Sequence, residues 1–243
     1  MIRRMIRIAL LLILVIVAWA YGLAVGHYHL PPFTQIQLAF RAIRNWGSDS
    51  PQNWAYKSIY EMRAPILSAF PPKAQIAMVG DSLTNLAEWS GIFPDADIAN
   101  YGISGDTVDG VFARVPDILR GDSKKIFLMI GINDLLAGNS VSSIMPKYKN
   151  LVEALGQSGA HVFVQSTLCT SDDVYLNPRV LELNAVLRTF CTTNASRCTF
   201  IDIAVSQCPK DHLDNGMTVD GLHLTPLGYR QWRDTIAQYV MAK

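Results

Sequence analysis

The chain has 243 residues, 50% of them hydrophobic, and its formal net charge is +1 at pH 7. This length fits one domain plus an extension, and the apolar content is enough for a sizeable core. The near-zero net charge gives no electrostatic reason to expect a nucleic-acid partner, because nucleic-acid-binding domains are usually strongly basic.

The first 26 residues indicate a membrane anchor. Their three arginines lie among the first seven positions, and residues 8–26 then form an apolar run of 19 without Asp, Glu, Lys or Arg. As a helix, this run would span roughly 28 Å, close to the thickness of a bilayer core. Because the positive charges precede the run, we expect a single-pass anchor in a bacterial inner membrane, with the N-terminus in the cytoplasm and the rest of the chain in the periplasm. The alternative is a signal peptide cleaved near Ala18-Trp19-Ala20, which would leave a secreted protein.

Residues 27–72 form a predicted juxtamembrane linker. Paired prolines lie near both of its ends, and we expect two helices between them, at 34–45 and 52–69. In the second helix, the apolar residues that could share one face are Trp54, Ile59, Met62, Ile66 and Phe70. We expect this stripe to pack on the domain that follows. The alternative is that the linker helices dock an envelope assembly complex.

Residues 73–243 alternate between strand-like and helix-like segments. Apolar runs predict five strands, at 75–79, 97–101, 125–130, 161–166 and 199–204. Helical spacing predicts helices at 142–157 and 178–192, and a last helix that opens at Thr225-Pro226, a cap followed by a proline. Such alternation predicts an α/β fold with a five-stranded parallel sheet in the flavodoxin-like order 2-1-3-4-5, covered by helices on both faces.

Four short motifs follow the predicted strands. They are Gly80-Asp81-Ser82-Leu83-Thr84, Gly102-Ile103-Ser104-Gly105-Asp106-Thr107, Gly131-Ile132-Asn133-Asp134 and Asp220-Gly221-Leu222-His223. Ligands of open parallel sheets bind beyond the carboxyl ends of the strands. We therefore expect the four motifs to meet at one edge of the sheet.

Together these motifs hold the residue types that acyl-ester hydrolysis needs. Ser82 would be the nucleophile, His223 the general base, and Asp220 the carboxylate that orients the imidazole. The backbone N–H groups of Ser82 and Gly102 and the side-chain amide of Asn133 would form an oxyanion hole. Each residue alone has a simpler interpretation as a helix cap, a turn residue or a loop glycine, so the prediction rests on their combination.

The four motifs resemble those of the SGNH (GDSL-type) hydrolases over about residues 75–241. The four letters of that family would be Ser82, Gly102, Asn133 and His223. The resemblance implies a three-layer α/β/α fold and a serine esterase or lipase mechanism that needs no metal and no other cofactor.

The same resemblance implies that Asp81 and Asp134 support the site structurally. The segment 100–107 is similar to the branch that contains platelet-activating-factor acetylhydrolase-like proteins and bacterial acylhydrolases. That branch often has arginine where this chain has Tyr101, beside the predicted oxyanion loop.

We expect the substrates to be O-acetyl esters of envelope or exported polysaccharide. This expectation follows from the predicted location and from the substrates that are usual in the family that the chain resembles. Lipid acyl esters, cleaved by a lysophospholipase or thioesterase activity, are the alternative, and acyl transfer is a further one. An anchored binding module that has lost catalysis is the alternative outside the enzymes. A fluorophosphonate probe that reacts with active-site serines distinguishes it from the others.

The four cysteines predict disulfides in a chain that lies outside the cytosol. Six residues separate Cys191 from Cys198, and we favour that pair, which leaves Cys169 with Cys208. Other pairings and four free thiols remain open at this point. No Cys-x-x-Cys motif occurs, so zinc binding has no support from the cysteines.

Overall fold

The computed structural model describes Tyr21 and residues 51–171, 173, 175–214 and 216–242. Tyr21 apart, the expected anchor over residues 1–26 lies outside these residues, and so does the expected helix at 34–45. In the described part of the chain, no helix combines the length and the apolar character needed to cross a membrane. Residues 52–243 form one compact unit.

Five parallel strands form one sheet in the order β2-β1-β3-β4-β5, as the sequence predicts. Their bounds are β1 (Ile76–Gly80), β2 (Ile98–Gly102), β3 (Lys125–Met129), β4 (His161–Gln165) and β5 (Cys198–Ile201). The register aligns Gly80 at the end of β1 with Gly102 at the end of β2 and with Met129 at the end of β3. The first three motifs therefore emerge from the same edge of the sheet.

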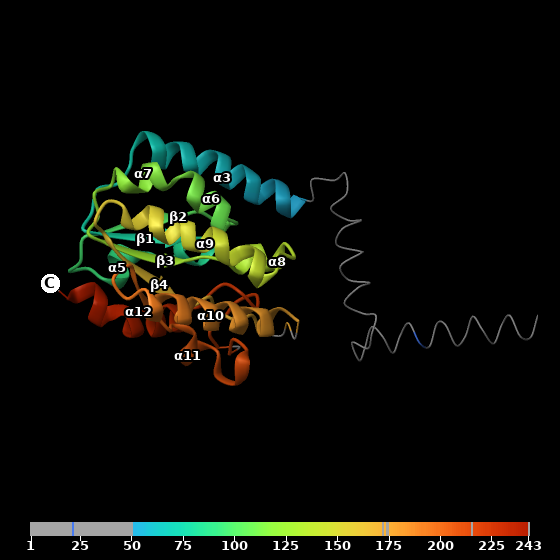
Figure 1. Cartoon of the computed structure of the whole chain (residues 1–243). Helices are drawn as coiled ribbons and strands as arrows, with labels where there is room; N and C mark the ends of the chain where they lie inside the picture. The colour runs from blue at the N-terminus through green and yellow to red at the C-terminus, as the bar shows by residue number, and fades with distance from the viewer. Residues whose placement is uncertain (1–20, 22–50, 172, 174, 215, 243) are drawn as a thin grey trace, which may run out of the picture. The chain divides into compact units, whose positions relative to one another are not determined.

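Helices cover both faces of the sheet and complete three layers. One face packs on α3 (Pro51–Ala69), α6 (Val108–Ala113), α7 (Val115–Leu119), α8 (Ile132–Leu136), α9 (Val141–Gly156) and α10 (Leu176–Thr193). The other packs on α4 (Ser82–Asn85), α5 (Trp89–Ile92), α11 (Ala204–Gln207) and α12 (Pro226–Met241). A short 3-10 turn at Pro209–Asp211 contacts α10. Figure 1 shows α3, α6 and α7 above the strands and α11 and α12 below them.

Alternating side chains of each strand fill the two cores. In β1, Ala77 and Val79 belong to one core, whereas Ile76 and Met78 belong to the other. This arrangement follows from the two-residue period of a strand and explains why β1 is apolar at every position. Thr225 caps α12 by accepting a hydrogen bond from the Gly228 N–H, as the sequence predicts.

Helix α3 packs on the domain, and Ile59 of the predicted stripe contacts the core, but three other members of the stripe do not. Met62, Ile66 and Phe70 are 61%, 60% and 78% exposed. The side chain of Trp54 lies outside the described residues. The residues of α3 that contact the core are Ile59, Tyr60, Ala64 and Leu67.

Polar contacts account for this orientation of α3. The Tyr60 hydroxyl donates a hydrogen bond to the carbonyl of Gly110, and the Arg63 side chain bonds the edge strand β2. A half-buried tyrosine hydroxyl and guanidinium need such partners, whereas apolar residues on a surface helix are common. The polar residues therefore decide which side of α3 faces the sheet.

The cysteines follow the prediction in part. Cys191 and Cys198 form a disulfide that joins the end of α10 to the start of β5. Cys169 and Cys208 are free thiols, so the structure does not contain the second predicted disulfide. The Cys208 sulfur instead accepts a hydrogen bond from the Cys169 N–H at 3.1 Å, which satisfies this buried amide without an S–S bond.

Candidate active site

Ser82 is the first residue of α4, directly after strand β1. The Asp81 carboxylate caps this helix by accepting a hydrogen bond from the Leu83 N–H at 3.0 Å. The turn is so tight that a Cβ at Gly80 would overlap the hydroxyl of Thr84, and it would also overlap the carbonyl of Met129 on β3. The strand-to-helix turn thus fixes Ser82 at the carboxyl edge of the sheet, where the helix N-terminus favours a developing anion.

The loop before α12 brings His223 and Asp220 to Ser82. The Ser82 Oγ lies 2.8 Å from His223 Nε2, and His223 Nδ1 lies 2.6 Å from Asp220 Oδ2. Both distances are those of hydrogen bonds. With the ring proton on Nδ1, facing the carboxylate, Nε2 is free to accept the proton of the serine hydroxyl.

Asp220 is held as an anion beside His223. Its Oδ1 accepts hydrogen bonds from the N–H groups of Leu222 and His223, at 3.0 and 2.7 Å. Partial burial acts to raise the pKa of Asp220, but the bonds from the His223 ring and from the two backbone N–H groups outweigh it and lower the pKa. A carboxylate in this state stabilises the imidazolium that forms when His223 takes a proton.

The two predicted oxyanion donors outside the nucleophile turn are already hydrogen-bonded within the protein. The Gly102 N–H donates to Asn100 Oδ1 at 2.9 Å, and Asn133 Nδ2 donates to the Asp106 carbonyl at 2.8 Å. The Asn133 amide carries a second hydrogen that can bind an oxyanion. Gly102 has one N–H, which a bound oxyanion must share with Asn100.

Gly102 must be glycine because helix α4 passes against it. A Cβ at this position would overlap the backbone of Asn85. Its φ does not fall among the positive values found at other glycines, so close approach and not a left-handed turn explains this residue. Asn100 reinforces the contact by donating from Nδ2 to the carbonyls of Asn85 and Ala87, at 3.1 and 3.2 Å.

Arg63 supports the same region from helix α3. Its Nε donates to the Gly102 carbonyl at 2.7 Å, and its Nη2 donates to the Asn100 carbonyl at 3.2 Å. Strand β2 is an edge strand, and these carbonyls alternate with those that pair with β1. Arg63 therefore ties down the free side of the strand that carries Gly102. Sequence reasoning missed this residue, because nothing in its neighbourhood marks it.

Three carboxyl groups lie buried beneath the site. Asp106 Oδ2 accepts from Arg114 Nε at 2.9 Å, and Asp134 Oδ2 accepts from the Val108 N–H at 3.1 Å. Burial raises the pKa of Asp81 to about 7, assisted by the charges of Asp106 and Asp134, and burial raises the pKa of Asp134 to about 6. Asp81 and Asp134 thus hold the N-termini of α4 and α6.

The described residues contain no group of three His, Cys, Asp or Glu side chains placed to hold a metal ion. A serine, a histidine and a carboxylate joined by hydrogen bonds at the carboxyl edge of a parallel sheet define a serine hydrolase. The chain belongs to the GDSL-like Lipase/Acylhydrolase family, whose model matches residues 78–231. The family range includes all four motifs entirely, and it leaves out α3.

Solved structures of esterases and lipases share this fold. A Streptococcus pneumonia protein assigned as a platelet activating factor has a TM-score of 0.67 and 18% identity, over 84% of this chain and 99% of that one. A GDSL-like lipase from Bacteroides thetaiotaomicron has a TM-score of 0.63 and 18% identity, over 74% and 96%. A catalytic mutant of an acetylxylan esterase from Geobacillus stearothermophilus has a TM-score of 0.60 and 15% identity, over 71% and 96%. At these identities the likeness concerns the fold.

Curated relatives show a partial match. N-acylneuraminate cytidylyltransferases of Streptococcus agalactiae are 27% identical over 127 residues, which is 52% of this chain. The matched region is 30% of the length of those relatives. Their activity as whole proteins is therefore not carried over to this chain.

Proposed function

We propose that Ser82 is the nucleophile, His223 the general base and Asp220 the orienting carboxylate of this acylhydrolase. The 2.8 Å contact between Ser82 Oγ and His223 Nε2 carries the proposal. Ser82 attacks the ester carbonyl while Nε2 takes its proton, and the same proton then goes to the departing alcohol oxygen. His223 then takes a proton from water, which attacks the acyl-enzyme, and returns this proton to Ser82 Oγ as the acid leaves.

The oxyanion of each tetrahedral intermediate is bound by the N–H groups of Ser82 and Gly102 and by the amide of Asn133. The Gly102 N–H reaches it by sharing its hydrogen with Asn100 Oδ1, which lies 2.9 Å away. Each such donor contributes roughly 2.7–4 kcal/mol of transition-state stabilisation in enzymes where it has been removed. Arg63 holds the strand end that presents Gly102.

The substrates proposed are short acyl esters, above all O-acetyl groups on envelope or exported polysaccharide. An acetylxylan esterase among the proteins of the same fold supports this choice, although its identity to this chain is only 15%. Lipid acyl esters are the competing substrates, which the proposed membrane anchor would favour. An acyltransferase would use the same acyl-enzyme but pass the acyl group to a sugar hydroxyl.

The proposed location is the periplasmic side of an inner membrane, with residues 1–26 as the anchor. The Cys191–Cys198 disulfide supports a compartment outside the cytosol, because such bonds persist in oxidising surroundings. Protease treatment of spheroplasts tests this placement. Digestion of the domain in intact spheroplasts agrees with it, and protection of the domain until lysis contradicts it.

The substrate proposal is tested with p-nitrophenyl esters from acetate to palmitate, using the protein and its Ser82→Ala variant. A Ser82-dependent rate that falls steeply beyond butyrate supports short acyl groups. A maximum at octanoate or longer contradicts the acetyl-ester proposal and supports lipid substrates. No Ser82-dependent rate on any of these esters contradicts a general esterase and leaves the transferase and the binding module to be tested.

A further inference from the structure

A pocket of about 440 Å³ opens between α5 and the start of α12. Leu224, which directly follows His223, lines it, and so does Leu86. The Leu86 N–H donates to the Ser82 carbonyl at 2.9 Å, so this side chain begins where the nucleophile helix ends. Two of the lining residues therefore lie next in the chain to the nucleophile helix and to the base.

Tyr229 forms a fixed apolar floor in this pocket. Its hydroxyl donates to the Leu83 carbonyl at 2.8 Å, and its ring is stacked on Trp232 with centroids 6.0 Å apart. Burial raises the pKa of Tyr229, which keeps the phenol neutral. These contacts fix the Tyr229 ring before a ligand binds. An apolar group or the face of a sugar ring can therefore pack on it without a further loss of side-chain entropy.

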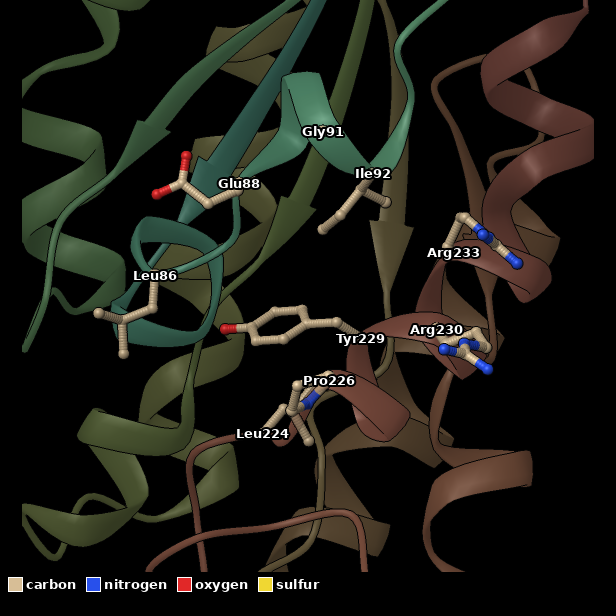
Figure 2. Close-up of a pocket in the computed structure, with 9 residues that line it drawn as sticks. All are labelled: Leu86, Glu88, Gly91, Ile92, Leu224, Pro226, Tyr229, Arg230 and Arg233. Atoms are coloured by element: carbon tan, nitrogen blue, oxygen red, sulfur yellow. The ribbon is translucent and has the colours of Figure 1, made fainter.

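Charges divide the pocket into two ends. Figure 2 shows Leu86 and Glu88 on one side of the Tyr229 ring and Arg230 and Arg233 on the other. Arg233 makes an exposed ion pair with Asp234, while Arg230 has no hydrogen bond or ion pair among the residues described by the structure. The Glu88 carboxylate disfavours an anion near Leu86, and the two guanidiniums favour an anion at the far end.

We propose that this pocket binds the alcohol part of the ester, and that it selects alcohols bearing a carboxylate or phosphate. The inference rests on the proposed function of Ser82 and His223. With the ester carbonyl at Ser82, the alcohol lies across the Tyr229 ring and its anionic group meets Arg230 and Arg233. When the ester bond breaks, the alcohol oxygen takes the proton from His223 Nε2, and the alcohol leaves from this pocket.

Two acetyl esters that differ in charge test the pocket. The first is 4-acetoxybenzoate, whose leaving phenol carries a carboxylate, and the second is its neutral methyl ester. For each enzyme form we would measure the ratio of the two kcat/KM values, corrected for the uncatalysed rates. The full-length protein should favour the anion, and the Arg230→Gln/Arg233→Gln double variant should lower this ratio about five- to tenfold.

Arg197→Gln is the matched control, because Arg197 is an exposed arginine that pairs with Glu153 elsewhere on the surface. Its ratio should equal that of the unchanged protein. The preference for the anion should also shrink as NaCl is raised, since exposed charges are screened.

The outcomes separate this inference from the proposed function on which it rests. Ser82-dependent hydrolysis of both esters, with the same ratio in the double variant as in the control, overturns the anion subsite and leaves the esterase standing. Absence of Ser82-dependent hydrolysis of either ester overturns the proposed function, and the subsite with it.

Discussion

Replacing Arg63 with methionine tests whether helix α3 supports the chemistry of the site. The change keeps the aliphatic stem but removes the hydrogen bonds to the carbonyls of Gly102 and Asn100. The end of β2 would then be held on its outer side by α3 packing alone. We expect a lower kcat with an unchanged KM, because Arg63 acts through Gly102 and not on the substrate.

The magnitude follows from the two bonds. Hydrogen bonds from charged donors contribute about 1.5–3 kcal/mol when buried, and the half-exposed position of Arg63 reduces the pair to about 2 kcal/mol in total. For a domain of this size that corresponds to a fall in Tm of about 4–8 °C. Displacing the Gly102 N–H should weaken the binding of the oxyanion less than deleting a donor would, so we expect kcat to fall about tenfold.

The assay is steady-state hydrolysis of p-nitrophenyl acetate beside calorimetry, with Lys57→Met as the control. Lys57 lies on the same helix and makes an exposed pair with Glu61 at 3.9 Å. The control should keep both kcat and Tm. A normal kcat in Arg63→Met, together with a lowered Tm, would show that Arg63 stabilises the fold without positioning Gly102. If neither quantity changes, both parts of the reasoning are wrong.

Three further predictions concern Asp220, the Cys191–Cys198 disulfide and the buried carboxyl of Asp81. Asp220→Asn should lower kcat by about 10²–10⁴-fold without unfolding the protein, since His223 loses its anionic partner; an unchanged kcat in a protein with normal circular dichroism contradicts this. Changing Cys191 and Cys198 to serine should lower the free energy of unfolding by about 2–3 kcal/mol in urea, because their sequence separation is 7; equal stability with and without a reductant would refute it. Because the pKa of Asp81 is raised to about 7, the folded protein keeps a proton that the unfolded chain releases, so the free energy of unfolding falls as the pH rises from about 4 to 7. Asp81→Asn keeps the cap, and its stability relative to the unchanged protein should be higher at pH 8 than at pH 5. An equal difference in stability at both pH values would contradict the raised pKa.

The sheet and the meeting of the motifs were predictable because two strong signals agree. Strands buried on both faces are apolar at every position, as β1 is, and parallel strands present their following loops at one edge. The positions of Ser82 after β1, Gly102 at the end of β2 and Asn133 after β3 follow directly. Asp220 and His223 lie far away in sequence, yet the capped helix that follows them fixes where their loop must end.

Other features depend on which of several possible contacts a residue makes in the folded protein, and the sequence does not reveal this choice. The apolar stripe of α3 was expected to face the domain, but Tyr60 and Arg63 bond the carbonyls of Gly110 and Gly102, and most of the stripe stays exposed. The Gly102 N–H bonds Asn100 because α4 runs close enough for Asn100 to bridge it. Both outcomes depend on tertiary distances of a few ångströms, which neither periodicity nor motif spacing encodes.

The central claim is that Ser82 is the activated nucleophile. The most direct measurement is the intact mass of the protein after reaction with a fluorophosphonate probe, in the unchanged form and as Ser82→Ala and Ser104→Ala. Ser104 is a second buried serine near the same edge, bonded to Asn85, and it serves as the control. We expect one adduct, mapped to Ser82, in the unchanged protein and in Ser104→Ala. We expect no adduct in Ser82→Ala. An adduct that persists in Ser82→Ala, or no adduct in the unchanged protein, would contradict it.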